Sequence, residues 1–189
     1  NSAKIFNFDI SNIRSKSNIS SGVYFLNFTG TNEIFQNSIS DVSNSGTTSG
    51  TSLAAGIQIQ NSSGTATARV YNNFIYDIKS SYTSSASSTI MAYGIYCNVS
   101  TSSTTSEIDN NNVYLSVVSG TPTYSAACFG IGSTTGIHKV RGNIFVNVFP
   151  NQTSSAYHTA FYSPVTNSIG GTGSISNFND LYVTGTNGY

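Results

Sequence analysis

The sequence contains very little charge. Of its 189 residues only seven are Lys or Arg and seven are Asp or Glu, which amounts to 7% of the chain and a formal net charge of zero. An ordinary soluble domain has about 25% charged residues. A neutral chain with scattered cations has no field that attracts phosphate backbones, so we expect no nucleic-acid partner.

Other scarce residue types exclude further classes of protein. Cys97 and Cys128 are the only cysteines and form no CxxC motif, so we expect two unpaired thiols. With only His138 and His158, and no HxH or HExxH spacing, we expect neither a metal site nor a cofactor. No run of 18 apolar residues is present, which predicts no membrane insertion. The length fits one domain, residues 1–189.

Neutral polar and β-branched residues take the place of charge. The chain has 34 Ser, 22 Thr and 22 Asn, together with 18 Ile and 12 Val but only 4 Leu. Disordered chains lack aromatic residues, whereas this one has 12 Tyr and 11 Phe. An excess of Ile and Val over Leu favours strands over helices, so we predict an all-β protein.

A repeat organises the chain. Five ten-residue segments align without gaps: KIFNFDISNI from Lys4, EIFQNSISDV from Glu33, RVYNNFIYDI from Arg69, EIDNNNVYLS from Glu107 and KVRGNIFVNV from Lys139. A sixth, SISNFNDLYV from Ser174, fits with one inserted residue. Between them lies a second strand pattern: GVYF from Gly22, GIQI from Gly56, GIYC from Gly94, GIG from Gly130 and the degenerate HTAFY from His158.

Units of this length cannot bury their apolar faces alone, but stacked units form a continuous core. Regular hairpin-turn dipeptides, which a propeller needs, are missing between the segments. We therefore predict a single-stranded parallel β-helix, or β-solenoid, of about five to six coils with three short strands per coil. The general preference for right-handed crossovers predicts a right-handed helix.

Two columns of residues follow from this register. Asn37, Asn73, Asn111 and Asn143 fall at one bend, where Asn side chains can hydrogen-bond along the axis and Asn tolerates left-handed backbone. The first position of successive segments alternates in sign, which we interpret as a charge ladder that fixes the stacking order. The ladder consists of Lys4, Glu33, Arg69, Glu107 and Lys139.

The segments AYGIYCN, NNNVYLSVVSGT, VRGNIFVN and NFNDLYVTGTNGY resemble the right-handed β-helix regions of large secreted surface proteins of Bacteroidetes-type bacteria. The resemblance covers nearly the whole chain and implies an extracellular or cell-surface setting. Because the chain begins at Asn1 without a Met or a signal-peptide pattern, we interpret it as part of a longer secreted protein.

Carboxylates are missing where enzymes of this fold carry them. Such enzymes act on polysaccharides from the outer face of the first strand of each coil, and glycoside hydrolysis needs two carboxyl groups within about 10 Å. The expected outward residues are Tyr24, Gln58, Gln60, Tyr96, Asn98, Gly132, Thr159 and Phe161. None is acidic, so we assign no catalytic residue. Asp41 and Asp77 share a column and are a weak candidate for a cation site, the alternative being a stack of Asn and Asp side chains near a turn.

Aromatic and amide residues on the same face suggest contact with sugars. The candidates are Tyr24, Gln58, Tyr96 and Phe161, because aromatic rings with amide neighbours suit a flat sugar-binding surface. The alternative is that these rings pack under adjacent loops.

Two hypotheses of function remain. The first is a non-enzymatic structural or adhesive module of a surface protein, with neighbouring domains, copies of itself stacked end to end, or glycans as partners. The second is a polysaccharide-active enzyme, a lyase or glycoside hydrolase, or a carbohydrate-binding domain on the same fold.

Overall fold

The computed structural model describes residues 2–16, 19–46, 53–80, 90–116, 124–148, 158–164 and 169–184. Within these ranges the secondary structure consists of strands β1 to β20, with no helix. Every described strand pair is parallel, and the strands form four sheets, which we label A to D.

Sheets A and D carry the longest strands. Sheet A has six strands in the order β1 (Lys4–Phe6), β5 (Gly30–Phe35), β9 (Ala66–Tyr71), β13 (Thr104–Asp109), β16 (Ile137–Arg141) and β19 (Ile175–Asn177). Sheet D has five, in the order β4 (Ser20–Leu26), β8 (Ala54–Asn61), β12 (Ile90–Val99), β15 (Ser125–Ile131) and β18 (His158–Tyr162).

Sheets B and C follow sheet A in each coil. Sheet B has six strands in the order β2 (Asp9–Ile10), β6 (Ser38–Ile39), β10 (Phe74–Tyr76), β14 (Asn112–Ser116), β17 (Ile144–Val148) and β20 (Asp180–Thr184). Sheet C has three: β3 (Ile13–Ser15), β7 (Val42–Asn44) and β11 (Ile78–Ser80).

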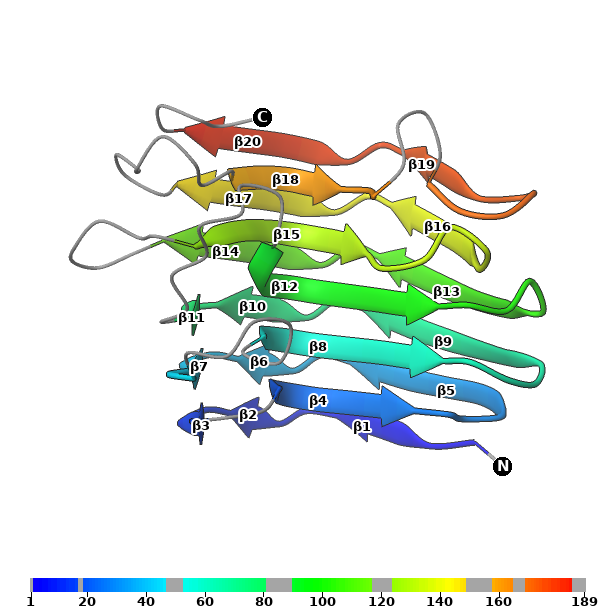
Figure 1. Ribbon diagram of the computed structural model, residues 1–189, viewed down its shortest axis with the longest axis horizontal. Coiled ribbons are helices and arrows are strands. Elements are labelled where there is room, and N and C mark those ends of the chain that lie inside the picture. The colour runs from blue at the N-terminus through cyan, green and yellow to red at the C-terminus, as the bar shows by residue number, and fades with distance from the viewer. Residues whose placement is uncertain are drawn as a thin grey trace.

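The chain winds as a parallel β-solenoid, as predicted. In Figure 1 the strands of sheet D run to the right at the front, those of sheets A and B return to the left behind, and the chain climbs from bottom to top. This path is right-handed. From β4 to β18 the chain completes four turns, with a partial coil at each end, so the number of coils is slightly lower than the five to six expected.

The register confirms the repeat and corrects it in two places. Lys4, Glu33, Arg69, Glu107 and Lys139 pair in sequence, as the alignment predicts. Lys139 then pairs with Ile175, so the sixth copy starts at Ile175 and needs no inserted residue.

The second correction concerns sheet D. We aligned Gly130 with Gly94, but Gly130 pairs with Tyr96, and Cys128 stands at the position of Gly94. A Cβ atom at Gly94 would lie 2.2 Å from Cγ1 of Val113 across the core, which requires glycine in that coil. The next coil accommodates Cys128 at this position, opposite Phe145 instead of Val113.

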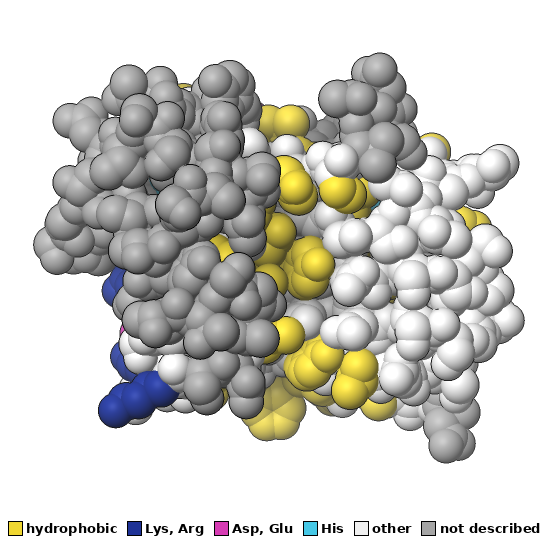
Figure 2. Space-filling model, viewed as in Figure 1, with side chains coloured by type: hydrophobic (Ala, Val, Ile, Leu, Met, Phe, Trp, Pro, Cys, Tyr) yellow, Lys and Arg dark blue, Asp and Glu magenta, His cyan; other side chains and the backbone are white. Residues whose placement is uncertain are grey.

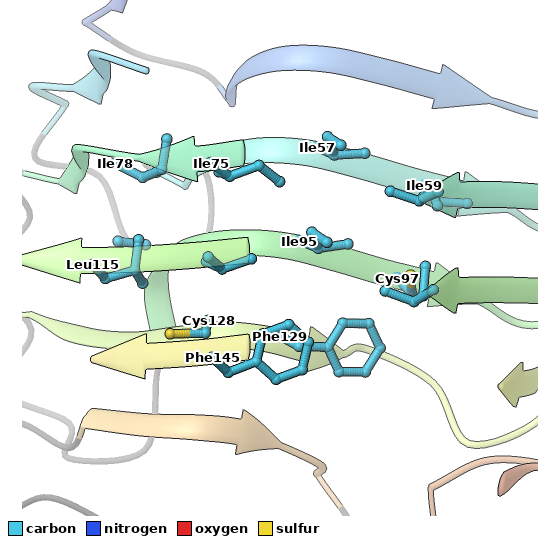
Figure 3. Packing of buried hydrophobic residues seen from close by; sticks show 14 of the residues in the cluster. Ile57, Ile59, Ile75, Ile78, Ile95, Cys97, Leu115, Cys128, Phe129 and Phe145 are labelled. Carbon is cyan, nitrogen blue, oxygen red and sulfur yellow. The ribbon is translucent and has the colours of Figure 1, made fainter. Parts of the chain in front are cut away.

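β-Branched side chains fill the centre of each coil. Residues such as Ile57 and Ile95 from sheet D face Ile75 and Ile78 from sheets B and C, and all four are fully buried (Figure 3). In an upper coil Phe129 and Phe145 stack with centroids 6.0 Å apart. Cys97 and Cys128 are free thiols buried in this core, as predicted.

A ladder of buried Asn side chains runs along the axis where sheet A turns into sheet B. Each Asn Nδ2 donates to the Oδ1 of the Asn one coil above, at 2.8 to 3.0 Å. The Oδ1 of each upper Asn also accepts from the backbone N–H of the Asn below, and that of Asn37, the lowest, accepts from the backbone N–H of Phe8. The Asn ladder consists of Asn37, Asn73, Asn111, Asn143 and also Asn179, which the sequence analysis did not include.

The left-handed backbone that we expected at this bend lies one residue before the Asn ladder. Six residues at this bend, one in each coil, have positive φ values of 55° to 64°. The column itself comprises Asn7, Gln36, Asn72, Asn110, Gly142 and Phe178. The bend and the hydrogen-bonded column are therefore two adjacent positions, and only the second one requires Asn.

We predict that Asn111→Ala lowers the free energy of unfolding by at least about 3 kcal/mol. The substitution leaves the buried N–H of Asn73 without its acceptor and removes the donors to Val70 O and to Asn143 Oδ1. Chemical denaturation followed by circular dichroism measures the change. The control is Asn112→Ala, at the exposed next residue, which should change the value by less than about 0.5 kcal/mol. Equal losses would contradict the ladder.

Candidate binding faces

The charge ladder lies on the outer face of sheet A. Glu33 contacts Lys4 Nζ at 2.7 Å and Arg69 Nη1 at 4.0 Å. Glu107 contacts Arg69 Nε at 3.0 Å and Lys139 Nζ at 3.1 Å. Burial opposes the charge of Glu107, but the hydrogen bond and charge of Lys139 and the charge of Arg69 leave its pKa below the usual range.

Three further acidic residues, Asp109, Asp41 and Asp77, also have cationic partners. Arg141 Nε donates to Asp109 Oδ1 at 2.8 Å, two positions along the same strands as the charge ladder. Arg14 pairs with Asp41 at 2.5 Å, and Lys79 pairs with Asp77 at 2.7 Å.

Asp41 and Asp77 therefore do not form the shared cation site that we considered. They occupy one column with Asn12, and all three have positive φ, which places them at the bend between sheets B and C. Among the described residues no group of three or more His, Cys, Asp or Glu side chains could hold a metal ion. Their place in one column at a bend is what the alternative, a stack of Asn and Asp side chains near a turn, requires.

We predict that Glu107→Lys lowers the free energy of unfolding by about 1–2 kcal/mol at low ionic strength, because three cations then occupy adjacent coils. Adding 1 M NaCl should recover part of the loss by screening. The control Glu107→Gln removes the attraction without adding repulsion and should cost less. A double variant with Lys139→Glu restores one opposite-charge contact and should regain stability. Additive losses would contradict the ladder.

Aromatic rings on sheet A stack on one another. Phe6 and Phe35 have centroids 4.9 Å apart with rings 1° from parallel, and Phe35 and Tyr71 are 4.8 Å apart at 2°. These rings cover each other's faces, so the stack stabilises neighbouring coils and offers a ligand mainly ring edges.

The outer face of sheet D differs from our expectation. Tyr24, Gln58, Tyr96, Gly130 and Tyr162 form one column. Gln58 is only 1% exposed, and its Oε1 accepts from Ser21 Oγ at 2.9 Å. Gln58 is thus a buried hydrogen-bonded residue and not a sugar-contact candidate.

Phe161 was also assigned to the wrong face. It pairs with Phe129, and the two rings pack at 5.0 Å against the hydrophobic core. The outward residue of this strand is Tyr162. The two-residue shift of Gly130 does not account for this, because side chains alternate with a period of two. The segment HTAFY itself was placed one residue out of step: Phe161 stands in the inward column of Ile95 and Phe129.

Tyr93 and Tyr96 lie over glycines of the next coil. Their rings stack at 4.5 Å, and a Cβ atom at Gly130 would lie 2.2 Å from Tyr93 Cε1. Burial raises the pKa of Tyr96.

Figure 2 shows hydrophobic side chains in a band across the middle of this face, beside an uncharged polar surface. Of the four candidates, only Tyr24 is well exposed, at 41%, and its hydroxyl donates to Gln60.

A Cys, a Ser and a His meet inside the solenoid. Ser106 Oγ lies 2.6 Å from His138 Nδ1, and His138 Nε2 lies 3.3 Å from Ser133 O. Burial raises the pKa of Cys97 to about 12, partly opposed by a hydrogen bond from Ser106. All three side chains are fully buried, and a thiol with a raised pKa is a poor nucleophile, so this cluster is part of the core.

Both histidines are fully buried, and burial lowers their pKa values, that of His158 to about 3. A histidine whose pKa is lower in the folded state makes its full contribution to the free energy of unfolding above its unfolded pKa of about 6.5. That contribution is lost as the pH falls.

We predict that the free energy of unfolding falls by about 2 kcal/mol from His158 alone between pH 7.5 and pH 5. Denaturant titrations at the two pH values measure it. In His158→Gln the difference between the two pH values should shrink by about that amount, whatever the variant's stability at pH 7.5. The same pH dependence in the variant and the unsubstituted protein would contradict the neutral buried histidine.

A set of outward aromatic and aliphatic side chains lies on sheet B, and the sequence analysis missed it. We call it the sheet B strip: the exposed Phe74, Tyr114, Ile144 and Tyr182 with the partly buried Tyr76 and Val146. Phe74, Tyr114 and Tyr182 are 48%, 42% and 54% exposed. The alternation of side chains within the ten-residue segments, such as RVYNNFIYDI from Arg69, is the signal that predicts this face.

Comparison of the chain with family models, with curated proteins and with solved structures gave no match. Across the described ranges there is also no helix of the length and apolarity that a membrane crossing requires.

Proposed function

We propose that this chain is a non-enzymatic structural or adhesive module of an extracellular or cell-surface protein, whose solenoid presents fixed side faces to partners. Neighbouring domains of a longer chain and further copies of the solenoid are candidate partners at its ends. The resemblance to secreted bacterial β-helix regions supports the setting, and the distribution of carboxylates supports the absence of catalysis.

The carboxylates are the observation that carries this proposal. Five of the seven acidic residues pair with cations: Glu33, Asp41, Asp77, Glu107 and Asp109. Asp9 and Asp180 have no ion pair within the described residues. They stand in one column of sheet B, five strand spacings apart.

This separation is too large for a catalytic pair. At about 4.8 Å per spacing, Asp9 and Asp180 lie about 24 Å apart. Glycoside hydrolases place their two carboxyl groups about 5–10 Å apart. Glu107 is also a poor general acid, since the neighbouring cations Lys139 and Arg69 lower its pKa.

The alternative function is a polysaccharide lyase or glycoside hydrolase. Asp41 and Asp77 stand in one column on adjacent coils, outside the charge ladder. An enzyme using this column would have to displace the Arg14 and Lys79 partners.

We predict that the protein releases neither reducing ends nor unsaturated sugars from a panel of neutral and acidic polysaccharides. Reducing-sugar assays and absorbance of unsaturated products measure this. The matched control is the double variant Asp41→Ala, Asp77→Ala, prepared in parallel. Release that is present in the unsubstituted protein and absent in the double variant would overturn the proposal in favour of the enzyme.

A further inference from the structure

The sheet B strip is formed by two columns of outward side chains on the middle and upper coils. One column runs Phe74, Asn112, Ile144, and the other runs Tyr76, Tyr114, Val146, Tyr182. Along each strand these outward residues alternate with buried ones. The parallel sheet therefore repeats each column once per coil, with about 4.8 Å between successive strands.

The rings of the strip differ from the stacked rings on sheet A. Phe74 and Tyr76 contact each other at 5.0 Å and 34°, across one strand. Tyr114 and Tyr182 have no ring contact among the described residues, and both are more than 40% exposed. Aromatic faces that are not covered by other rings are available to a ligand.

Uncharged hydrogen-bonding groups border the rings. Asn72 and Asn110 stand at exposed bends beside the strip, and Asn112 lies within it. Their side-chain amides make no hydrogen bond to other described residues. The charged groups nearest the strip are the ion pairs Asp77 with Lys79 and Asp109 with Arg141, and the carboxylate of Asp180, which stands next above Ile144 in its column and has no ion pair within the described residues. The strip therefore combines apolar ring faces with neutral donors and acceptors, and a single carboxylate lies at its upper end.

This combination fits a sugar better than a protein surface. Pyranose rings present C–H groups to aromatic faces and hydroxyl groups to amides, and neutral sugars bring no charge. A stable protein interface takes about 20–30 residues on each side, far more than the six apolar side chains of the strip. A linear polysaccharide repeats along its length as the coils do, so successive sugars can meet successive coils.

We propose that the sheet B strip binds a linear, uncharged polysaccharide that lies along the solenoid axis, with Tyr114 and Tyr182 stacking on sugar rings and Asn110 and Asn112 bonding to hydroxyl groups. This inference rests on the proposed function, because it assumes that the sheet B strip binds the polysaccharide without cleaving it. It places glycan contact on sheet B and not on the sheet D residues that the sequence suggested.

The test is calorimetry with gluco-, xylo- and manno-configured hexasaccharides and the matching disaccharides, with soluble neutral polysaccharides in native affinity gels as a second measurement. At least one hexasaccharide should bind, and at least ten-fold more tightly than its disaccharide, because more coils are engaged. Anionic polygalacturonate should bind more weakly than the neutral polysaccharide.

Substitutions on two different sheets test which face binds the glycan. Tyr114→Ala and Tyr182→Ala should each weaken hexasaccharide binding at least ten-fold. Tyr24→Ala is the matched control, an equally exposed tyrosine on sheet D, and should change the affinity less than two-fold. Circular dichroism and the unfolding midpoint establish that each variant is folded.

Each other outcome overturns the inference. No binding by any neutral glycan, or loss of binding in Tyr24→Ala alone, removes the strip as the glycan site while leaving the non-enzymatic module intact. Dimerisation of the unsubstituted protein that is lost in Tyr114→Ala would assign the strip to a second copy of the chain. Cleavage of the hexasaccharide would instead overturn the proposed function itself.

Discussion

The structure depends on stacking each coil in register on the one below. The Asn ladder enforces this register because its side chains are buried and each amide is bonded to the coils on both sides. A shift by one residue would leave buried amide groups without partners, at about 1–3 kcal/mol each. The charge ladder and the stacked rings of Phe6, Phe35 and Tyr71 reinforce the same register from outside.

This constraint explains why few charged residues are left unpaired on the surface. Most charged residues are paired between coils or along one strand, and neutral Ser, Thr and Asn provide the remaining polar surface. The same stacking repeats any outward position once per coil. A face that carries exposed rings, such as sheet B, thus becomes a regular array, and an array of this kind suits a ligand with its own repeat.

The sequence was sufficient to predict the fold and the two ladders, because Asn and alternating charges recur at fixed template positions. It did not predict the register of the sheet D strand in the coil of Cys128. There the need for glycine depends on how closely a core side chain approaches from the opposite sheet. Val113 approaches Gly94 in this way, whereas in the next coil Cys128 replaces the glycine.

Burial was also unpredictable from alternation alone: outward Gln58 is buried, whereas outward Tyr114 is exposed. The residue with left-handed backbone varies from Asn to Phe178, so composition does not mark it.

The most direct test of the central claim is nuclear magnetic resonance of the Asn side chains. With the register described here, the Nδ2 protons of Asn73 and Asn111 exchange slowly with solvent and show Overhauser contacts to Asn111 and Asn143, respectively. Fast exchange of these amide protons, or contacts to residues other than those one coil away, would contradict the stacked register on which the account of the faces rests.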